Sequence, residues 1–130
     1  MILLDTHVWV WWLAEPSRLS TKAAAAIAAA PRIAISAISC WEITMLAERG
    51  RLAFDRPIER WIREALTVDS RIEATPLHPD VAVDAGLLAQ EGFHGDPADR
   101  FLYATAMSLG APMVTRDAAI RAFSPDRTVW

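Results

Sequence analysis

Short runs of consecutive apolar residues alternate along the chain with longer segments whose apolar residues recur at helical spacing. A short apolar run between polar or turn residues is typical of a strand that is buried on both faces of a sheet. The strands predicted in this way cover residues 2–4, 33–35, 72–75, 113–115 and 128–130.

Helices are predicted between these strands, and residues that favour helix starts and stops stand at their ends. Ser20 and Thr21 precede an alanine-rich helix, Pro57 lies in the first turn of an amphipathic helix, and Gly50 and Gly110 follow two others. The predicted helices cover residues 6–13, 22–30, 37–49, 57–68, 79–90 and 97–109, with a further short helix before the last strand.

Strands that alternate with helices predict one α/β domain over residues 1–130, a three-layer sandwich in which helices flank a mostly parallel central sheet. In an open sheet of this kind, ligands bind beyond the carboxyl ends of the strands. Asp5 and Asp117 come just after two of the predicted strands, so the sequence places both at that edge.

The composition agrees with a single folded domain. The chain has 130 residues, of which 53% are hydrophobic and 22% charged, and no long polar low-complexity run predicts disorder. Asp5 interrupts the apolar start, and the longest apolar run, residues 8–14, is too short to cross a bilayer. We therefore expect a cytoplasmic protein without a secretion signal or a membrane segment.

The cysteine content and the net charge narrow the function classes further. A single cysteine, Cys40, allows neither an internal disulfide nor a cysteine-based zinc site, and we expect it to be a small buried apolar residue. The formal net charge of −3 is a weak argument against a protein that coats nucleic acid. It does not exclude a nuclease, because bound divalent cations supply positive charge where a phosphate binds.

Four acidic residues lie at comparable places in the predicted fold: Asp5 after the first strand, Glu42 early in the third helix, Asp99 in a first turn, and Asp117 after a late strand. Each has a structural explanation by itself. Asp5 and Asp117 suit helix caps, Glu42 completes a capping box that begins at Ser39, and Asp99 favours the positive end of its helix. The whole set is more informative than any one member.

Carboxylates that gather at one edge of a sheet repel one another unless a cation lies among them. Oxygen ligands with open coordination positions suit Mg²⁺ or Mn²⁺, which prefer carboxylate and water. A cation held in this way polarises a phosphate oxygen and lowers the pKa of bound water, so that hydroxide can attack phosphorus. The four acids therefore indicate a magnesium or manganese site suited to phosphodiester hydrolysis.

Four segments, in this order, resemble the motifs of PIN-domain ribonucleases: residues 3–9 (LLDTHVW), 39–43 (SCWEI), 94–100 (HGDPADR) and 114–117 (VTRD). The resemblance extends over nearly the whole chain, and the third segment is similar to the form found in VapC toxins of VapBC toxin–antitoxin pairs. It implies a PIN-like fold and a ribonuclease that depends on Mg²⁺ or Mn²⁺. It also implies three partners: an RNA substrate such as tRNA or another structured RNA, a VapB-like antitoxin, and a second copy of the chain in a homodimer.

By position, the resemblance implies that Asp5 and Asp99 are the principal ligands of a first metal ion. It implies that Glu42 binds the same ion or orients the attacking water, and that Asp117 completes a second site or an outer shell. These four residues form the predicted catalytic and metal-binding set.

Three further residues are expected to support this set. Thr6 and Thr115 are expected to form hydrogen bonds within the acid cluster. Asp96 lies three residues before Asp99, but Pro97 favours the first helical position, so we interpret Asp96 as the helix cap or as a supporting residue.

The histidines and tryptophans are expected to be structural. The three histidines, His7, His78 and His94, lack the spacing of a zinc site, and we do not expect one of them to be catalytic. Five tryptophans fall on predicted helices and are expected to pack in the core, with part of their surface covered by a partner: Trp9, Trp11, Trp12, Trp41 and Trp61.

Two other classes of protein fit parts of the pattern. A phospho-acceptor receiver domain also places acids around Mg²⁺ at strand ends, but it needs paired acids near its first strand and a late lysine. Here Asp5 stands alone and Lys22 is the sole lysine. A non-catalytic protein-binding module with the same fold is the alternative function, and the presence of all four acids argues against it.

Overall fold

A computed structural model describes residues 1–130 and contains one five-stranded sheet in which every pair of neighbouring strands is parallel. The predicted α/β sandwich is therefore confirmed, and the sheet is parallel throughout rather than mostly parallel. The strands, in the order β3-β2-β1-β4-β5 across the sheet, are β1 (Ile2–Leu4), β2 (Ile33–Ser36), β3 (Ile72–Thr75), β4 (Met113–Val114) and β5 (Thr128–Val129).

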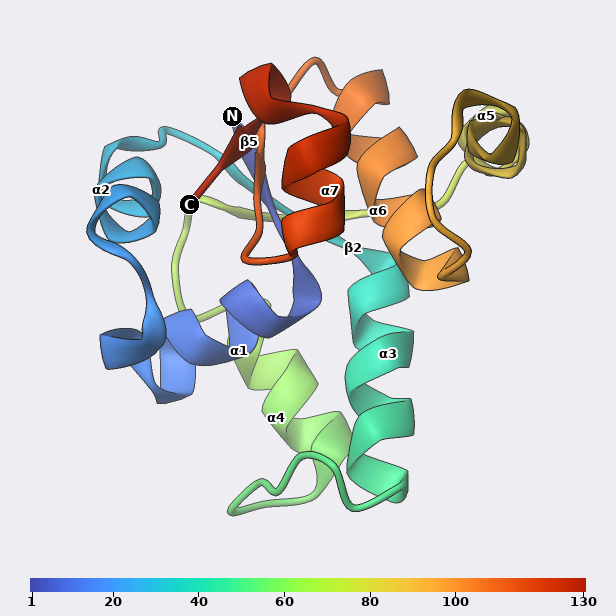
Figure 1. Ribbon diagram of the computed structural model, residues 1–130. Coiled ribbons are helices and arrows are strands. Elements are labelled where there is room, and N and C mark those ends of the chain that lie inside the picture. Colours follow the sequence, from blue (N-terminus) through green and yellow to red (C-terminus); the bar gives the residue numbers. More distant parts are fainter.

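Helices connect all the strands (Figure 1). The α-helices are α1 (Thr6–Ala14), α2 (Thr21–Ala29), α3 (Ala37–Glu48), α4 (Ile58–Ala65), α5 (Pro79–Leu87), α6 (Pro97–Ser108) and α7 (Ala118–Phe123). Three short 3₁₀ helices complete the chain: η1 (Pro16–Arg18), η2 (Leu88–Glu91) and η3 (Pro125–Arg127).

Two hydrophobic layers cover the two faces of the sheet, because successive residues of a strand point to opposite sides. Ile2 and Leu4 pack with residues of α1, α2 and α4, whereas Leu3 packs with residues of α5, α6 and α7. Figure 1 shows α2 and α5 on opposite sides of the strands. Strands buried on both faces explain why their sequences read as continuous apolar runs.

Two helices are shorter than the sequence predicts, since apolar residues continue beyond their last helical turn. The helix α4 ends at Ala65, and Val68, which was expected to be helical, is exposed. The helix expected over residues 79–90 changes to η2 at Leu88 and ends at Gly92, whose φ of 84° favours a residue without a Cβ atom.

The buried positions also differ from two expectations. Trp9, Trp11 and Trp61 are buried as predicted, but the side chain of Trp41 is 55% exposed. Cys40 is half-buried rather than buried, whereas Ile43 on the same helix is fully buried. None of the helices combines the length and the apolar character that a membrane-spanning segment needs.

The order of the strands creates a topological switch point between β1 and β4. The chain runs outward from β1 to β2 and β3, and then returns on the other side of β1 with β4 and β5. The backbone N–H of Asp5 donates to the carbonyl of Val114 at 3.0 Å, which holds the segments after both strands side by side. Such a switch point is the usual ligand site of an open parallel sheet.

Candidate active site

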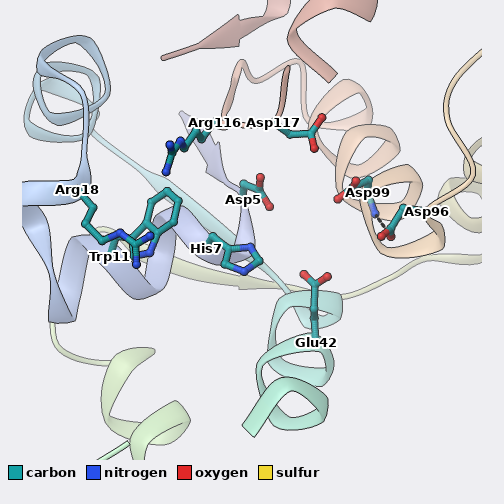
Figure 2. A pocket seen from close by; sticks show the side chains of 9 residues that line it. All are labelled: Asp5, His7, Trp11, Arg18, Glu42, Asp96, Asp99, Arg116 and Asp117. Carbon is teal, nitrogen blue, oxygen red and sulfur yellow. Dashed lines mark hydrogen bonds between the residues drawn. The ribbon is translucent and has the colours of Figure 1, made fainter. Parts of the chain in front are cut away.

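A cavity of about 530 Å³ lies at the switch point, and Trp11 is the single hydrophobic residue among the nine that line it. Figure 2 shows that the predicted acids come from four separate elements and line this one cavity. The lining residues are Asp5, His7, Trp11, Arg18, Glu42, Asp96, Asp99, Arg116 and Asp117.

Asp5 lies at the base of the site and is only 8% exposed. It occupies the N-cap position of α1, but its side chain makes no capping hydrogen bond, so the cap explanation is wrong. Its carboxylate instead accepts a hydrogen bond from the hydroxyl of Thr115, 2.6 Å away and 110 positions along the chain. The same Thr115 oxygen accepts from the backbone N–H of Asp117 at 3.0 Å, so one hydroxyl connects both strand-end acids.

Glu42 reaches the cavity because α3 begins earlier than a capping box requires. The helix cap is Ser36, whose hydroxyl accepts from the N–H of Ile38 at 3.2 Å, and the capping box expected at Ser39 is therefore wrong. Ser39 lies inside the helix, where it accepts a hydrogen bond from the hydroxyl of Thr6 at 3.0 Å. Glu42 has no capping role and points into the cavity (Figure 2).

Asp96 and Asp99 have separate roles, as Pro97 between them predicts. Asp96 is the N-cap of α6, and its carboxylate accepts from the N–H of Asp99 at 3.3 Å, which confirms it as the cap. Asp117 caps α7 in the same way, with a 2.8 Å hydrogen bond from the N–H of Ile120. Asp99 is left free of the helix backbone, and its carboxylate faces the cavity.

His94 contacts Asp99 and was not expected to take part in the site. Its Nε2 lies 2.6 Å from Oδ2 of Asp99. The imidazole stacks on Phe93 with 4.6 Å between the ring centres, and Arg100 donates to the His94 carbonyl at 2.8 Å. The motif around residues 94–100 was the available signal, since it brings His94 and Asp99 within five positions of each other. His94 therefore orients the Asp99 carboxylate.

Burial raises the pKa of Asp5, Glu42 and Asp99 above the ordinary values of carboxylic acids. For Asp99, burial and the negative charges of Asp5 and Asp96 outweigh the opposing hydrogen bond to His94, and the pKa is about 6. Burial likewise outweighs the hydrogen bond from Thr115 to Asp5. These raised pKa values identify a site in which negative charge lacks compensation.

The donor set fits a hard divalent cation. No group of three or more His, Cys, Asp and Glu side chains lies so that all of them could hold one metal ion. Mg²⁺ does not require such a group, because proteins usually hold it by one or two carboxylates while it keeps several waters. A cation among the half-buried and buried carboxylates would supply the positive charge that the protein itself does not bring to them.

Positive charge lines another part of the same cavity. Arg18 and Arg116 place their guanidinium groups against the ring of Trp11, 4.5 Å and 5.8 Å from its centre. Figure 2 shows Arg18 and Trp11 on the side of Asp5 that lies away from Asp99. Arg18, Arg116 and Trp11 were not expected in the site. The one signal in the sequence was the position of Arg116 next to Asp117.

Comparison with known proteins identifies the family to which this chain belongs. The profile of the family described as "PIN domain" matches residues 2–124. The chain belongs to the PIN-domain family. It is 40% identical over 131 aligned positions to Ribonuclease VapC22 of Mycobacterium tuberculosis, an alignment that covers 99% of this chain and 98% of that protein.

Solved structures of other proteins share the fold. A toxin–antitoxin complex from Klebsiella pneumoniae contains a chain with a TM-score of 0.69 and 22% identity, covering 100% of this chain and 97% of that one. VapC20 of Mycobacterium tuberculosis, described as a sarcin-ricin loop cleaving toxin, matches with a TM-score of 0.69 and 16% identity, covering 95% of each chain. These likenesses show the fold alone.

Proposed function

We propose that this PIN-domain protein is a metal-dependent ribonuclease that acts as the toxin of a toxin–antitoxin pair. The observation that carries the proposal is the meeting of Asp5, Glu42, Asp99 and Asp117 at one cavity of the sheet edge. The similarity of the chain to Ribonuclease VapC22 supports RNA as the substrate. We expect the target to be a tRNA or another structured RNA.

In this proposal Asp5 and Asp99 hold Mg²⁺ or Mn²⁺, with Asp117 completing the site. The bound ion supplies Lewis-acid activation of the phosphate and of a water molecule. Glu42 orients the attacking water and accepts its proton, a role suited to a carboxyl whose pKa burial has raised. His94 keeps the Asp99 carboxylate in place, and Thr115 does the same for Asp5.

RNA cleaved by this chain is expected to carry a 5′-phosphate and a 3′-hydroxyl. Water that attacks phosphorus leaves the 2′-hydroxyl of the ribose uninvolved. The measurement is incubation of bulk RNA with the purified chain and Mn²⁺, followed by sequencing of adapter-ligated 5′ ends with and without prior phosphorylation. Ends that ligate without phosphorylation, and disappear when EDTA replaces Mn²⁺, support the proposal.

A different cleavage chemistry would leave different RNA ends. His7 lines the cavity and His94 contacts Asp99, so a histidine-driven ribonuclease is the competing chemistry. Such an enzyme passes through a 2′,3′-cyclic phosphate and leaves a 5′-hydroxyl. Cyclic phosphate ends that form in EDTA contradict the metal mechanism, and intact RNA under all conditions contradicts the ribonuclease.

We further propose that the chain forms a homodimer and binds a VapB-like antitoxin. Several of the similar solved structures are toxin–antitoxin complexes, which supports a small protein partner. Large apolar side chains that are exposed on this chain support covered surface in an assembly: Trp41, Val68, Val83, Leu87 and Leu109. An arginine of the antitoxin that enters the acid cluster would replace the cation with its own charge and planar donors.

Excess Mn²⁺ is therefore expected to restore cleavage by the toxin–antitoxin complex without separating its chains. The arginine and the cation compete for the same carboxylates, while apolar contacts between the proteins persist. Size-exclusion chromatography and a parallel cleavage assay on the complex with the product of the neighbouring gene measure both properties. Inhibition that does not change with Mn²⁺, or an isolated chain that elutes as a monomer at micromolar concentration, contradicts this arrangement.

A further inference from the structure

We propose that Trp11, Arg18 and Arg116 form a clamp that binds the phosphates of an unpaired RNA segment beside the acid cluster. The inference rests on the proposed ribonuclease function and adds the residues that hold the substrate. In the clamp, the two arginines contact the RNA, and Trp11 is a positioning residue that acts through them.

The geometry of the three side chains is the first support. The guanidinium carbon of Arg18 lies 4.5 Å from the centre of the Trp11 ring, and that of Arg116 lies 5.8 Å away, both within the range of cation–π attraction. Trp11 is itself fixed, since it is 7% exposed and packs against His7 and Trp130 with ring centres 5.8 Å and 6.0 Å apart. A rigid indole therefore holds two flexible arginines from separate elements at one place.

The pairing of the arginines is the second support. Outside the cavity some arginines, such as Arg32, Arg56 and Arg71, form close ion pairs with acidic side chains, and others, such as Arg51, form none. Arg116 forms no ion pair, and Arg18 has only a long contact of 3.8 Å with the exposed Glu15. Neither arginine pairs with the five acids that line the same cavity. Their donors are thus free for an anion that occupies the space between them and the carboxylates.

Phosphate is the anion that this arrangement fits. A guanidinium group binds phosphate oxygens through paired donors, and its flat face can also stack on a base. Asp5 lies at the base of the cavity with 8% exposure, so the phosphate to be cleaved must enter the cavity. An unpaired strand can bend to do so, whereas a regular duplex holds its phosphates on a stiff outer surface. The clamp therefore binds the strand next to the nucleotide that enters.

Direct RNA binding tests the clamp without any need for cleavage. The probe is a fluorescein-labelled, unstructured RNA of about 12 nucleotides, a length within the usual site sizes for single strands. All proteins carry Asp99→Asn so that the probe stays intact, and fluorescence anisotropy measures Kd over a range of salt concentrations. Arg18→Gln and Arg116→Gln are compared with a control, Arg51→Gln. Arg51 is an exposed arginine that follows the C-terminal end of α3 and lies outside the cavity.

Each clamp variant is expected to raise Kd about tenfold, as loss of a hydrogen bond to a charged group does. It is also expected to reduce the slope of log K against log salt by about 0.7, the value for one phosphate contact on a single strand. Arg51→Gln should change neither quantity. Trp11→Leu should weaken RNA binding when both arginines are present. It should have little further effect once both arginines are replaced, because Trp11 acts by positioning the arginines.

Two outcomes overturn the clamp. One is binding by Arg18→Gln and Arg116→Gln that equals binding by Arg51→Gln, a comparison that stands even if Trp11→Leu does not fold. The other is weaker binding with an unchanged salt slope. Cleavage assays without the Asp99 change separate this proposal from the function on which it rests. A chain that cleaves with Mn²⁺ while Arg18→Gln leaves KM unchanged refutes the clamp alone, whereas clamp-dependent binding without any cleavage refutes the ribonuclease alone.

Discussion

Replacing Asp5 or Asp99 with asparagine is expected to abolish metal-dependent cleavage while leaving the fold intact or more stable. Loss of a residue that merely supports a metal ligand costs about 10- to 100-fold in activity or metal affinity, so loss of a ligand should cost at least about 100-fold. Asparagine keeps an oxygen that can accept the hydrogen bond from Thr115, which makes the exchange at Asp5 nearly isosteric.

The gain in stability follows from the raised pKa values. Burial disfavours the charged form of both carboxyls, and a neutral amide does not carry that cost. The midpoint of thermal unfolding without metal should therefore rise, by about 3 °C or more for each 1 kcal/mol gained. Cleavage of RNA with Mn²⁺ and circular dichroism on the same samples measure the two effects.

Asp84→Asn is the matched control, because Asp84 is an exposed acid on α5 and lies outside the cavity. It should change neither cleavage nor the unfolding midpoint. Full cleavage by the Asp5→Asn protein would falsify the assignment of Asp5 as a metal ligand. A fall in stability at both positions would show that the carboxylates support the fold rather than strain it.

The metal-free protein is expected to lose stability as the pH rises from about 4 to about 7. The pKa of Asp99 is about 6 in the folded protein against an ordinary value of 3.8, so the folded state binds more protons across this interval. Stability then falls as the pH rises toward the folded pKa, and the loss is complete above it. The raised pKa values of Asp5 and Glu42 act in the same direction.

Surface ion pairs do not account for this trend. Arg71 holds the pKa of Asp69 at about 2, and Arg32 lowers that of Glu73, so these carboxyls lose their stabilising charge only in more acidic solution. Saturating Mn²⁺ should raise the unfolding midpoint strongly at pH of about 7.5 and weakly at about 5, where protons compete for the carboxylates. Thermal scans at both values, with and without Mn²⁺, measure the difference.

In Asp99→Asn the dependence on pH should become flatter, since the group that titrates near neutrality is absent. A metal-free midpoint that increases with pH, or an Mn²⁺ shift of equal size at both values, would be inconsistent with the carboxylate site. The dependence of the unfolding midpoint on pH and Mn²⁺ tests the cation site without any RNA. The result therefore does not depend on which RNA is the substrate.

The sequence by itself determined the α/β class, the parallel sheet and the positions of the four acids along the chain. Strands buried on both faces must be apolar at every position, and their short apolar runs distinguish them from the amphipathic helices between them. The carboxyl ends of parallel strands share one edge, so an acid after β1 and an acid after β4 meet whenever those strands are adjacent. Local chemistry also offered the cap as one of two roles for Asp96, because proline favours the first helical position, and the structure selected that role.

The tertiary structure alone decided what surrounds those acids. The resemblance implied that Thr115 and Thr6 form hydrogen bonds within the acid cluster, but their partners became clear only in the folded molecule. Thr115 donates to Asp5, 110 positions away, and Thr6 donates to Ser39, 33 positions away. The clustering of Arg18 and Arg116 around Trp11 likewise depends on how η1 and the segment after β4 fold onto α1. Burial is a property of the packed molecule as well, and it is burial that raises the pKa of Asp99 and turns an ordinary first-turn aspartate into a candidate ligand.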